Sequence, residues 1–233
     1  MMNKAQVFEL LEQHQNLRGI ENWQKLTETG GLSSFGIGLT VQRKLAKQIG
    51  KNRPLAHELW ATDNYDAKVL GLLIDDPKQI TTEQAEQQVE ELNSGMLRHV
   101  FSSCDATLAK SPVAFEIAKS WLNSDDEVRR SCAYGLIYEL SKKKAKAYTD
   151  EFFLSVISNI NKNADKESKR VQLAMGGALM GIGKRNVELN RAALEVAERI
   201  GPIDFNEDGQ KCDPFDVVKH LTSDYLKKKL GIA

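Results

Sequence analysis

The sequence predicts an all-α protein made of repeated helical units, an α-solenoid that forms a single curved domain. The main observation is a phrase that occurs three times, in which an acid and a base five residues apart precede an apolar run: Asp63–Lys68, Asp125–Arg130 and Asp165–Arg170. The runs are rich in Leu, Ala and Gly and lack strand alternation, so we expect each phrase to begin a helix. Recurrence of one helical unit is typical of repeat proteins, which bind partners on an extended concave surface.

The first half of the chain carries further helix signals. Apolar residues at three- and four-residue spacing over residues 7–17 predict an amphipathic helix at the start. The glycine-rich stretch 30–38 predicts a loop, because glycine weakens a helix. A helix is expected to resume over 41–48, and Pro54 suits the first turn of the next one, where its missing N–H costs nothing.

In the second half, capping residues mark where helices begin. Thr81 with Gln84, and Ser124 with Glu127, have the spacing of capping boxes, in which a hydroxyl accepts a hydrogen bond from the helix backbone. We expect about a dozen helices, each roughly ten to eighteen residues long and joined by short connections.

The chain has one long break between helical patterns. A loop over 201–213 is expected to separate a last docked helix, over 214–229, from the rest of the chain. No linker is long or polar enough to mark a second domain. Residues 1–233 are therefore expected to form one domain.

Composition limits the class of protein. Of 233 residues, 41% are hydrophobic, which suffices for a large or continuous core. No apolar run approaches the roughly 18 residues of a membrane span, and the N-terminus begins an amphipathic pattern instead of a signal peptide. The three cysteines are widely spaced and the four histidines do not cluster, which favours neither disulfides nor a metal site. We expect a cytoplasmic protein without cofactors or membrane attachment.

Charge is balanced in total but unevenly distributed. The formal net charge is +0, yet residues 54–93 hold nine acids and two bases, a net of −7. Residues 125–191 hold thirteen bases and nine acids, a net of +4. The later segment is expected to line a basic groove suited to phosphates, with the acidic segment facing away. Ordinary solvated helix faces are the alternative for both segments.

Phe101 and Asp105 are four residues apart, a spacing that places a ring and a carboxylate on one face of a helix. Such a pair can hold a cation, for example a cationic base or a sugar cation. A core phenylalanine beside an aspartate that bonds the helix backbone is the alternative interpretation.

Four glycines lie in the helical pattern after the third phrase: Gly176, Gly177, Gly181 and Gly183. A phosphate-binding loop is excluded, because Arg185 stands where that motif requires Ser or Thr. Glycines in a helix allow either close packing of helices or the close approach of a ligand. Both interpretations stay open here.

Four segments carry a family resemblance: Ser34–Ile37, Leu59–Pro77, Cys104-Asp105 and Cys212–Pro214. Together they extend over most of the chain. They resemble the bacterial DNA alkylation repair family, which comprises the HEAT-like-repeat alkylpurine DNA glycosylases and their relatives. The resemblance implies a fold of HEAT-like repeats.

The resemblance also implies roles for individual residues. Active members of the family use an aspartate, an arginine and two tryptophans to grip DNA around a lesion and to stabilise positive charge as the glycosidic bond breaks. Asp105 matches the aspartate and Arg130 the arginine, so both are candidate catalytic residues. Phe101 matches the first tryptophan, whereas Gly177 stands near the second. The candidate DNA-binding residues are Phe101, Arg129, Lys169, Arg170, Gly177, Lys184 and Arg185.

Three functions are compatible with these residues. The first is a glycosylase acting on alkylated purines, a reaction in which one carboxylate can stabilise the sugar cation and position the water. The second is a DNA-binding relative without glycosylase activity, because the aromatic wall is missing at Gly177. The third is a protein-binding repeat scaffold. For the first two, the expected partner is double-stranded DNA, damaged or distorted, and the expected state is a monomer.

Overall fold

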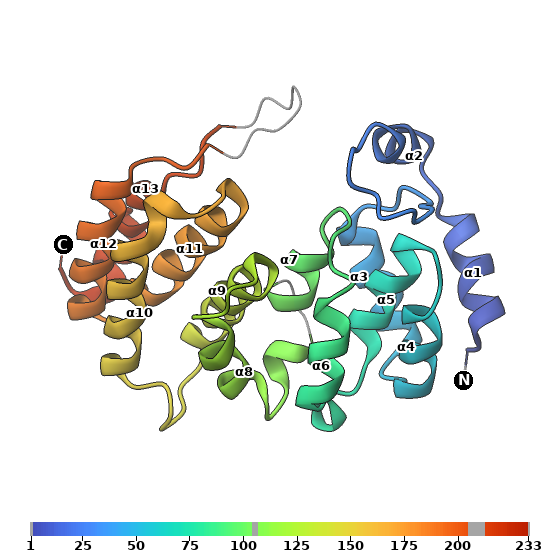
Figure 1. Ribbon diagram of the computed structural model, residues 1–233, viewed down its shortest axis with the longest axis horizontal. Coiled ribbons are helices and arrows are strands. Elements are labelled where there is room, and N and C mark those ends of the chain that lie inside the picture. Colours follow the sequence, from blue (N-terminus) through green and yellow to red (C-terminus); the bar gives the residue numbers. More distant parts are fainter. Residues whose placement is uncertain (1, 104–106, 205–212, 233) are drawn as a thin grey trace. The chain divides into compact units, whose positions relative to one another are not determined.

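The computed structural model describes residues 2–103, 107–204 and 213–232. These residues form α-helices joined by short loops and 3₁₀ turns, with two isolated bridges and no strand among them (Figure 1). The prediction of an all-α fold is thus confirmed. The chain divides into two compact units, residues 1–114 and residues 115–233, which we call the N-terminal and C-terminal units and describe separately.

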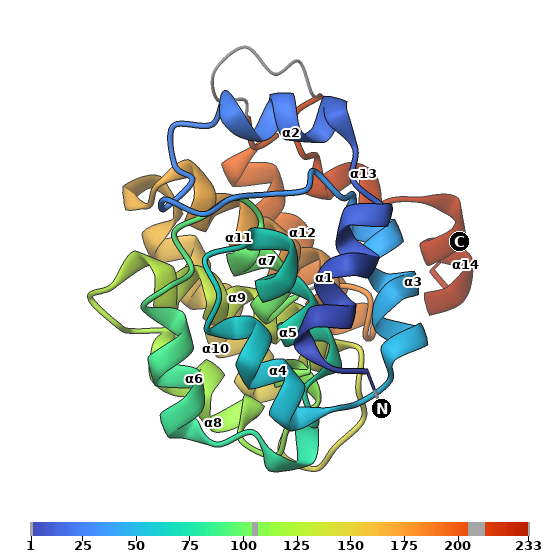
Figure 2. The same cartoon turned by 90° about the vertical axis from the view of Figure 1, so that its right-hand side faces the viewer.

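The N-terminal unit is organised around one buried helix. Its helices are α1 (Lys4–Gln13), α2 (Leu17–Gln24), α3 (Leu39–Ile49), α4 (Arg53–Trp60), α5 (Tyr65–Ile74), α6 (Thr82–Val89) and α7 (Leu97–Ser102). Helix α5 packs against α1, α3, α4 and α7, and Figure 2 shows α1, α3 and α4 around it. Every residue of α5 after the first is buried, as the continuous apolar run over 69–74 requires.

The glycine-rich loop over 30–38 is held to α5 by one buried carboxylate. Asp66 accepts hydrogen bonds from the Ser34 hydroxyl and the Phe35 amide, both at 2.7 Å, from the Ile37 amide at 3.2 Å and from the Gln42 side chain at 2.9 Å. Burial raises the pKa of Asp66, while these donors oppose the increase. The predicted loop is therefore ordered by contacts with a side chain of α5.

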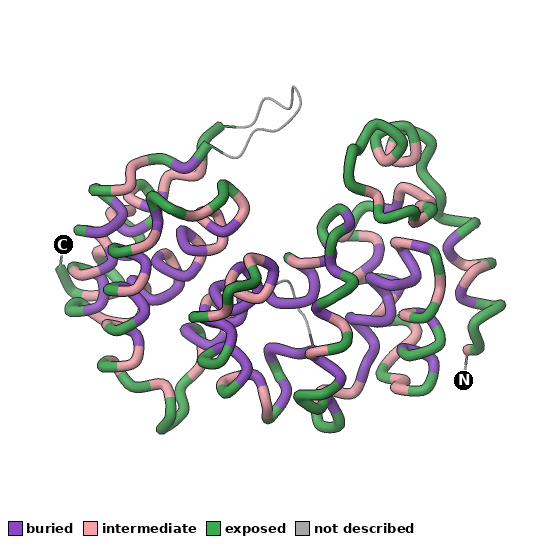
Figure 3. Tube along the Cα trace, viewed as in Figure 1, coloured by how far each residue is buried: buried purple, intermediate pink, exposed green. Residues whose placement is uncertain are grey.

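In the C-terminal unit, two helices run side by side in the same direction. Its helices are α8 (Ala114–Trp121), α9 (Glu127–Ser141), α10 (Asp150–Asn163), α11 (Lys169–Ile182), α12 (Val187–Ile200), α13 (Val217–Leu221) and α14 (Asp224–Leu230). Helices α9 and α11 pack along their lengths: Arg130 meets Glu167 near their first turns, and Ser141 meets Gly181 near their last. Figure 3 shows buried residues along α5, α9 and α11.

The three acid-to-base phrases begin α5, α9 and α11, as predicted. The residues that cap these helices are Asn64, Asp126 and Ser168, each of which accepts a hydrogen bond from a backbone amide of the first turn. Ser124 is not the cap of α9, contrary to expectation. Its hydroxyl instead accepts a hydrogen bond from the Asp126 amide and so supports the capping residue.

The prediction of a single last helix over 214–229 is wrong. Two short helices, α13 and α14, replace the single helix expected over 214–229. Thr222 is the C-cap of α13, and its hydroxyl donates to the Val218 carbonyl at 2.9 Å. Before α13, the backbones of Phe215 and Ile203 exchange two hydrogen bonds, so residue 215 cannot enter a helix. Among the described residues, no helix combines the length and apolarity needed to cross a membrane.

Candidate nucleic-acid interface

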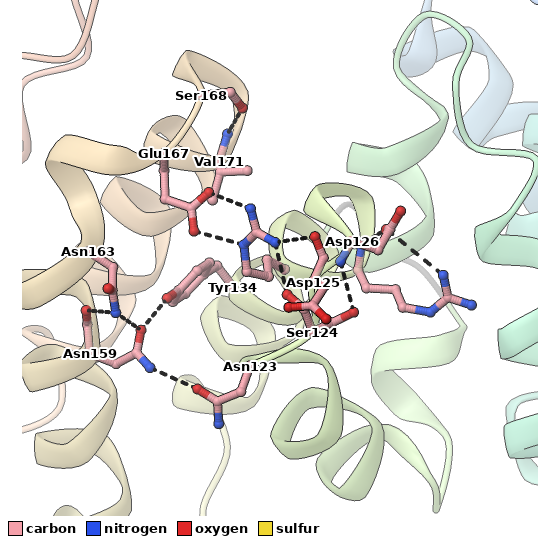
Figure 4. A network of polar contacts seen from close by, with 12 residues as sticks. Asn123, Ser124, Asp125, Asp126, Tyr134, Asn159, Asn163, Glu167, Ser168 and Val171 are labelled. Carbon is pink, nitrogen blue, oxygen red and sulfur yellow. Dashed lines mark hydrogen bonds and ion pairs between the residues drawn. The ribbon is translucent and has the colours of Figure 1, made fainter.

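Arg130 projects from the first turn of α9, and its guanidinium group donates four hydrogen bonds. Its Nε and Nη2 donate to the two carboxylate oxygens of Glu167 at 2.7 and 2.8 Å. Its Nη1 donates to the backbone carbonyls of Ser124 at 2.8 Å and Asp125 at 2.9 Å. Figure 4 shows the acceptors of these hydrogen bonds, with Glu167 near the start of α11 and Ser124 and Asp125 before α9.

This geometry makes Arg130 a strut between two helices. A two-point contact between guanidinium and carboxylate is the strongest geometry for such a pair. The side chains are only 22% and 10% exposed, and the hydrogen bond to Glu167 raises the pKa of Arg130. These hydrogen bonds use four of the five N–H donors of the guanidinium group, so a two-point contact with a phosphate would require displacing one of the present acceptors. The described structure therefore gives Arg130 a structural partner in the place where the resemblance implies a DNA contact.

The same strut occurs in the N-terminal unit. Lys68 is the fourth residue of α5, as Arg130 is the fourth residue of α9. Its Nζ donates to the Trp60 carbonyl at 2.6 Å and to Glu91 Oε2 at 2.7 Å, and it lies 4.5 Å from the centroid of the Trp60 ring. In both helices the base of the repeated phrase reaches back to a preceding carbonyl and forward to a glutamate. The phrase thus encodes a connection between helices.

The third phrase differs in detail. Its base, Arg170, is the second residue of α11, and Gln172 occupies the fourth position. The Gln172 side chain donates to the carbonyls of Ala164 at 2.9 Å and Glu167 at 3.1 Å. An amide therefore replaces the cation in the backward contact. Arg170 is half-exposed near the start of α11.

A second polar network lies beside Arg130. The Tyr134 hydroxyl donates to Asn159 Oδ1 at 2.9 Å, and the Asn159 amide donates to Asn123 Oδ1 at 3.2 Å (Figure 4). Asn163 donates to the same Asn159 oxygen at 3.2 Å. Burial raises the pKa of Tyr134. These bonds join α9 to α10, so the polar groups here serve packing.

The other predicted cations fall into two groups. Arg129, Lys169 and Arg170 lie at the beginnings of α9 and α11, where Lys169 is exposed and Arg129 lies 3.9 Å from Asp126. Lys184 and Arg185 follow the end of α11. Because α11 has 14 residues, its two ends are about 20 Å apart. The candidates therefore lie at the two ends of the packed pair of helices α9 and α11 instead of in one cluster.

Arg185 is also a structural residue. Its Nη1 donates to the carbonyls of Ser141 at 2.6 Å and Lys143 at 2.9 Å, and its Nη2 donates to the Tyr148 carbonyl at 3.3 Å. The guanidinium carbon lies 4.5 Å from the centroid of the Phe153 ring. Arg185 thus caps the end of α9 and fixes the connection to α10.

Lys184 faces a different environment. Burial is the main cause that lowers the pKa of its amine, and the charges of Lys142 and Lys229 lower it further. The Lys229 amine donates to the Lys184 carbonyl at 3.3 Å. We call Lys142, Lys184 and Lys229 the lysine cluster. Sequence reasoning identified Lys184 alone, because the three lysines are brought together only by the packing of three helices.

The glycines of α11 separate into two kinds. A Cβ placed on Gly177 would meet no atom within 4 Å, so this position faces open space. A Cβ on the other three would lie 2.7 Å or closer to a neighbouring side chain: Gly176 (Ile203), Gly181 (Ser141) and Gly183 (Leu221). Close packing explains those three. The room expected for a ligand exists only at Gly177, where no aromatic side chain stands.

Of the predicted pair Phe101 and Asp105, the structure describes only the phenylalanine. Phe101 is 1% exposed and belongs to the core of the N-terminal unit, which favours the core interpretation of its spacing. Asp105 lies outside the described residues, as do Cys104 and Cys212. Elsewhere in the part of the chain that the structure describes, no three His, Cys, Asp or Glu side chains gather as metal ligands.

Known proteins match the chain along most of its length. A family model for the DNA alkylation repair enzyme matches residues 7–205. Uncharacterized protein Lmo0209 of Listeria monocytogenes is 24% identical over 82% of this chain and 83% of its own length, and uncharacterized protein Lin0241 of Listeria innocua is 23% identical over the same shares.

A solved structure has the same fold. Its description is "a new family of proteins related to the HEAT-like repeat DNA glycosylases with affinity for branched DNA structures". The TM-score is 0.82 at 24% identity, and the match covers 99% of this chain and 97% of that one. The expected fold of HEAT-like repeats is confirmed. Since the family model covers well over half of the 233 residues, the chain belongs to the DNA alkylation repair enzyme family.

Proposed function

We propose that this protein binds double-stranded DNA that is branched or otherwise distorted, and that it does so without excising a base. The observation that carries the proposal is the environment of Arg130, whose guanidinium group is already held by Glu167 and two backbone carbonyls. Membership of a DNA repair family supports DNA as the partner. The affinity of the structural neighbour for branched DNA supports a distorted form of it.

The C-terminal unit carries positive charge that DNA can use. Residues 125–191 have the excess of four bases noted above. Among the described residues, Lys169 and Lys184 form no ion pair with a carboxylate, so their charges are available to phosphates. Contacts of this kind position DNA without reading its sequence. They suit a protein that recognises the shape of DNA.

Excision would need groups that the described structure does not offer to a ligand. The reaction depends on stabilising a developing sugar cation in a site where the damaged nucleotide is tightly held. Arg130 is engaged by Glu167, the Phe101 ring is buried, and Gly177 supplies no ring. Asp105 alone would remain to hold the nucleotide and stabilise its charge.

Two measurements on the same protein test the proposal. The first is fluorescence anisotropy with a four-way junction, a three-way junction and a matched linear duplex at several salt concentrations. The second is release of free methylated base from methylated duplex DNA, with Asp105→Asn as the matched variant. We expect tighter binding to the junctions than to the duplex, salt-dependent affinity for all three, and no released base from either protein.

The alternatives give different results. Release of base by the wild type but not by Asp105→Asn would show a glycosylase and overturn the non-catalytic part. Salt-independent or undetectable binding to every DNA would overturn the DNA-binding part and favour a protein-binding scaffold. Equal affinity for junction and duplex would remove the preference for distorted DNA.

A further inference from the structure

We infer that Lys142, Lys184 and Lys229 form a phosphate-binding cluster that grips the DNA backbone where α9, α11 and α14 end. The inference rests on the proposed function and assigns part of the DNA contact to specific side chains. Only Lys184 was a candidate from the sequence. Lys142 and Lys229 are added by the structure.

The three lysines come from the ends of three helices. Lys142 is the residue that follows the last residue of α9, Lys184 comes two residues after the end of α11, and Lys229 lies in the last turn of α14. The hydrogen bond from the Lys229 amine to the Lys184 carbonyl, at 3.3 Å, fixes α14 against the end of α11. Arg185 donates to the carbonyls of Ser141 and Lys143, on either side of Lys142, so the end of α9 also lies beside the end of α11.

The positive charge of the cluster is only partly balanced. The Lys142 amine pairs with Glu139 Oε1 at 2.7 Å and lies 3.8 Å from the centroid of the Tyr138 ring. Neither Lys184 nor Lys229 forms an ion pair with a carboxylate among the described residues. Two of three ammonium charges therefore lack an acidic partner. The repulsion between them lowers the pKa of Lys184 in addition to the effect of burial, and an anion between the amines would relieve it.

Capping of helix ends accounts for the Lys229 amine, which donates to the Lys184 carbonyl, but not for the whole arrangement. A lysine near the last turn interacts favourably with the partial negative charge of a helix C-terminus. One lysine at each end would serve this purpose with the amines pointing apart. Here the charges of Lys142 and Lys229 both act on Lys184, which costs free energy in the protein without a ligand.

The open face of α11 leads to the cluster. Leu173, Gly177 and Met180 are half-exposed and recur at spacings of four and three residues, so they share one face of the helix. Lys184 continues this series four residues later, after a C-cap that keeps the helical conformation. A phosphate backbone following this face would pass Gly177, where a Cβ would meet no atom, and reach the lysine cluster.

A nucleic acid fits the cluster better than an acidic peptide does. The adjoining lysines Lys144, Lys146 and Lys228 are exposed, which extends the positive charge beyond one binding point. Lysine binds phosphate as a compact point charge and needs no fixed fork of donors. DNA presents such charges at regular intervals, with one negative charge per about 1.7 Å of duplex axis.

The test compares two triple variants with the same change in charge. In the cluster variant, Lys142, Lys184 and Lys229 are each replaced by Gln. In the control variant, the exposed Lys119, Lys162 and Lys166 of the same unit are replaced by Gln. Affinity for the four-way junction and the duplex is measured by anisotropy over a range of salt, and thermal unfolding of both variants confirms that they fold.

We expect the cluster variant to lose about tenfold or more in affinity, with a slope of log K against log salt reduced by about 2 to 3, as loss of three phosphate contacts requires. The control variant should stay within about twofold of the wild type.

Other outcomes would contradict the inference. If the cluster variant bound DNA as tightly as the wild type, this inference would be overturned and the proposed function would stand. Equal losses in both variants would show an effect of net charge alone and overturn it as well. No binding by the wild type would overturn the proposed function itself. If the cluster variant lost binding to polyglutamate and kept its affinity for DNA, an acidic protein would be the partner instead.

Discussion

Arg130 and Glu167 join the first turn of α9 to the start of α11 through a two-point ion pair, with the nitrogen–oxygen distances at 2.7 and 2.8 Å. The residues are 37 positions apart in sequence. Lys68 and Glu91 form the equivalent contact in the N-terminal unit at 2.7 Å. In each unit, a basic residue at the fourth position of a helix thus binds a glutamate that lies later in the sequence. Repeat proteins depend on such contacts, because each unit is stabilised by its neighbours.

Replacement of Arg130 by Ala is expected to act on stability more than on DNA binding. The variant leaves Glu167 and two backbone carbonyls without their donors, which should cost about 2–4 kcal/mol of unfolding free energy. The salt dependence of DNA binding should stay unchanged, because the charge of Arg130 is paired with Glu167 and four of its five N–H donors are engaged. Urea unfolding and anisotropy measure the two effects.

A double-mutant cycle with Glu167→Ala supplies the control. The coupling free energy between the two substitutions should be about 1–3 kcal/mol. A large loss of DNA affinity in Arg130→Ala with little loss of stability would show that Arg130 contacts DNA, as the family resemblance implies.

Two glycines of α11 should respond in opposite ways to the same substitution. Gly177→Ala should raise the free energy of unfolding by about 0.5–1 kcal/mol, because the new Cβ meets no atom and alanine favours the helix. Gly181→Ala should lower it by about 1–3 kcal/mol, because its Cβ would collide with Ser141 and Tyr138. The midpoints of urea unfolding give both values. A loss of stability in Gly177→Ala would mean that a neighbour fills the space beside this position.

Local signals explain which features could be predicted from the sequence. The starts of α5, α9 and α11 follow from apolar runs and nearby capping side chains, both of which act within a few residues. The partner of Arg130 and the companions of Lys184 could not be predicted, because they depend on how helices far apart in sequence pack. The spacing of Phe101 was compatible with a core residue and with a ligand contact, and burial in the folded chain favours the core.

The carboxylate of Asp66 should be essential for the order of the loop over 30–38. Asp66→Asn keeps the size of the side chain but turns an amide group toward donors from Ser34, Phe35, Ile37 and Gln42. A buried network that loses its acceptor is destabilised by about 2–4 kcal/mol. Hydrogen exchange should show faster exchange of the Phe35 and Ile37 amides than in the wild type. Asp76→Asn, at a half-exposed carboxylate outside this network, is the control and should leave those two amides protected.

Tyr65 should make the protein sensitive to alkali. Burial raises its pKa from 10.0 to about 12, and its ring lies against Trp23 with the centroids 4.4 Å apart. Because the pKa in the folded state is higher than in the unfolded state, the neutral hydroxyl stabilises the fold fully below pH 10. That contribution is lost as pH rises from 10 toward 12, and it amounts to about 2–3 kcal/mol. The unfolding free energy of Tyr65→Phe should therefore decline less steeply than that of the wild type over this interval. Parallel curves for the two proteins in urea unfolding between pH 9 and pH 12 would show that Tyr65 ionises freely in the folded chain.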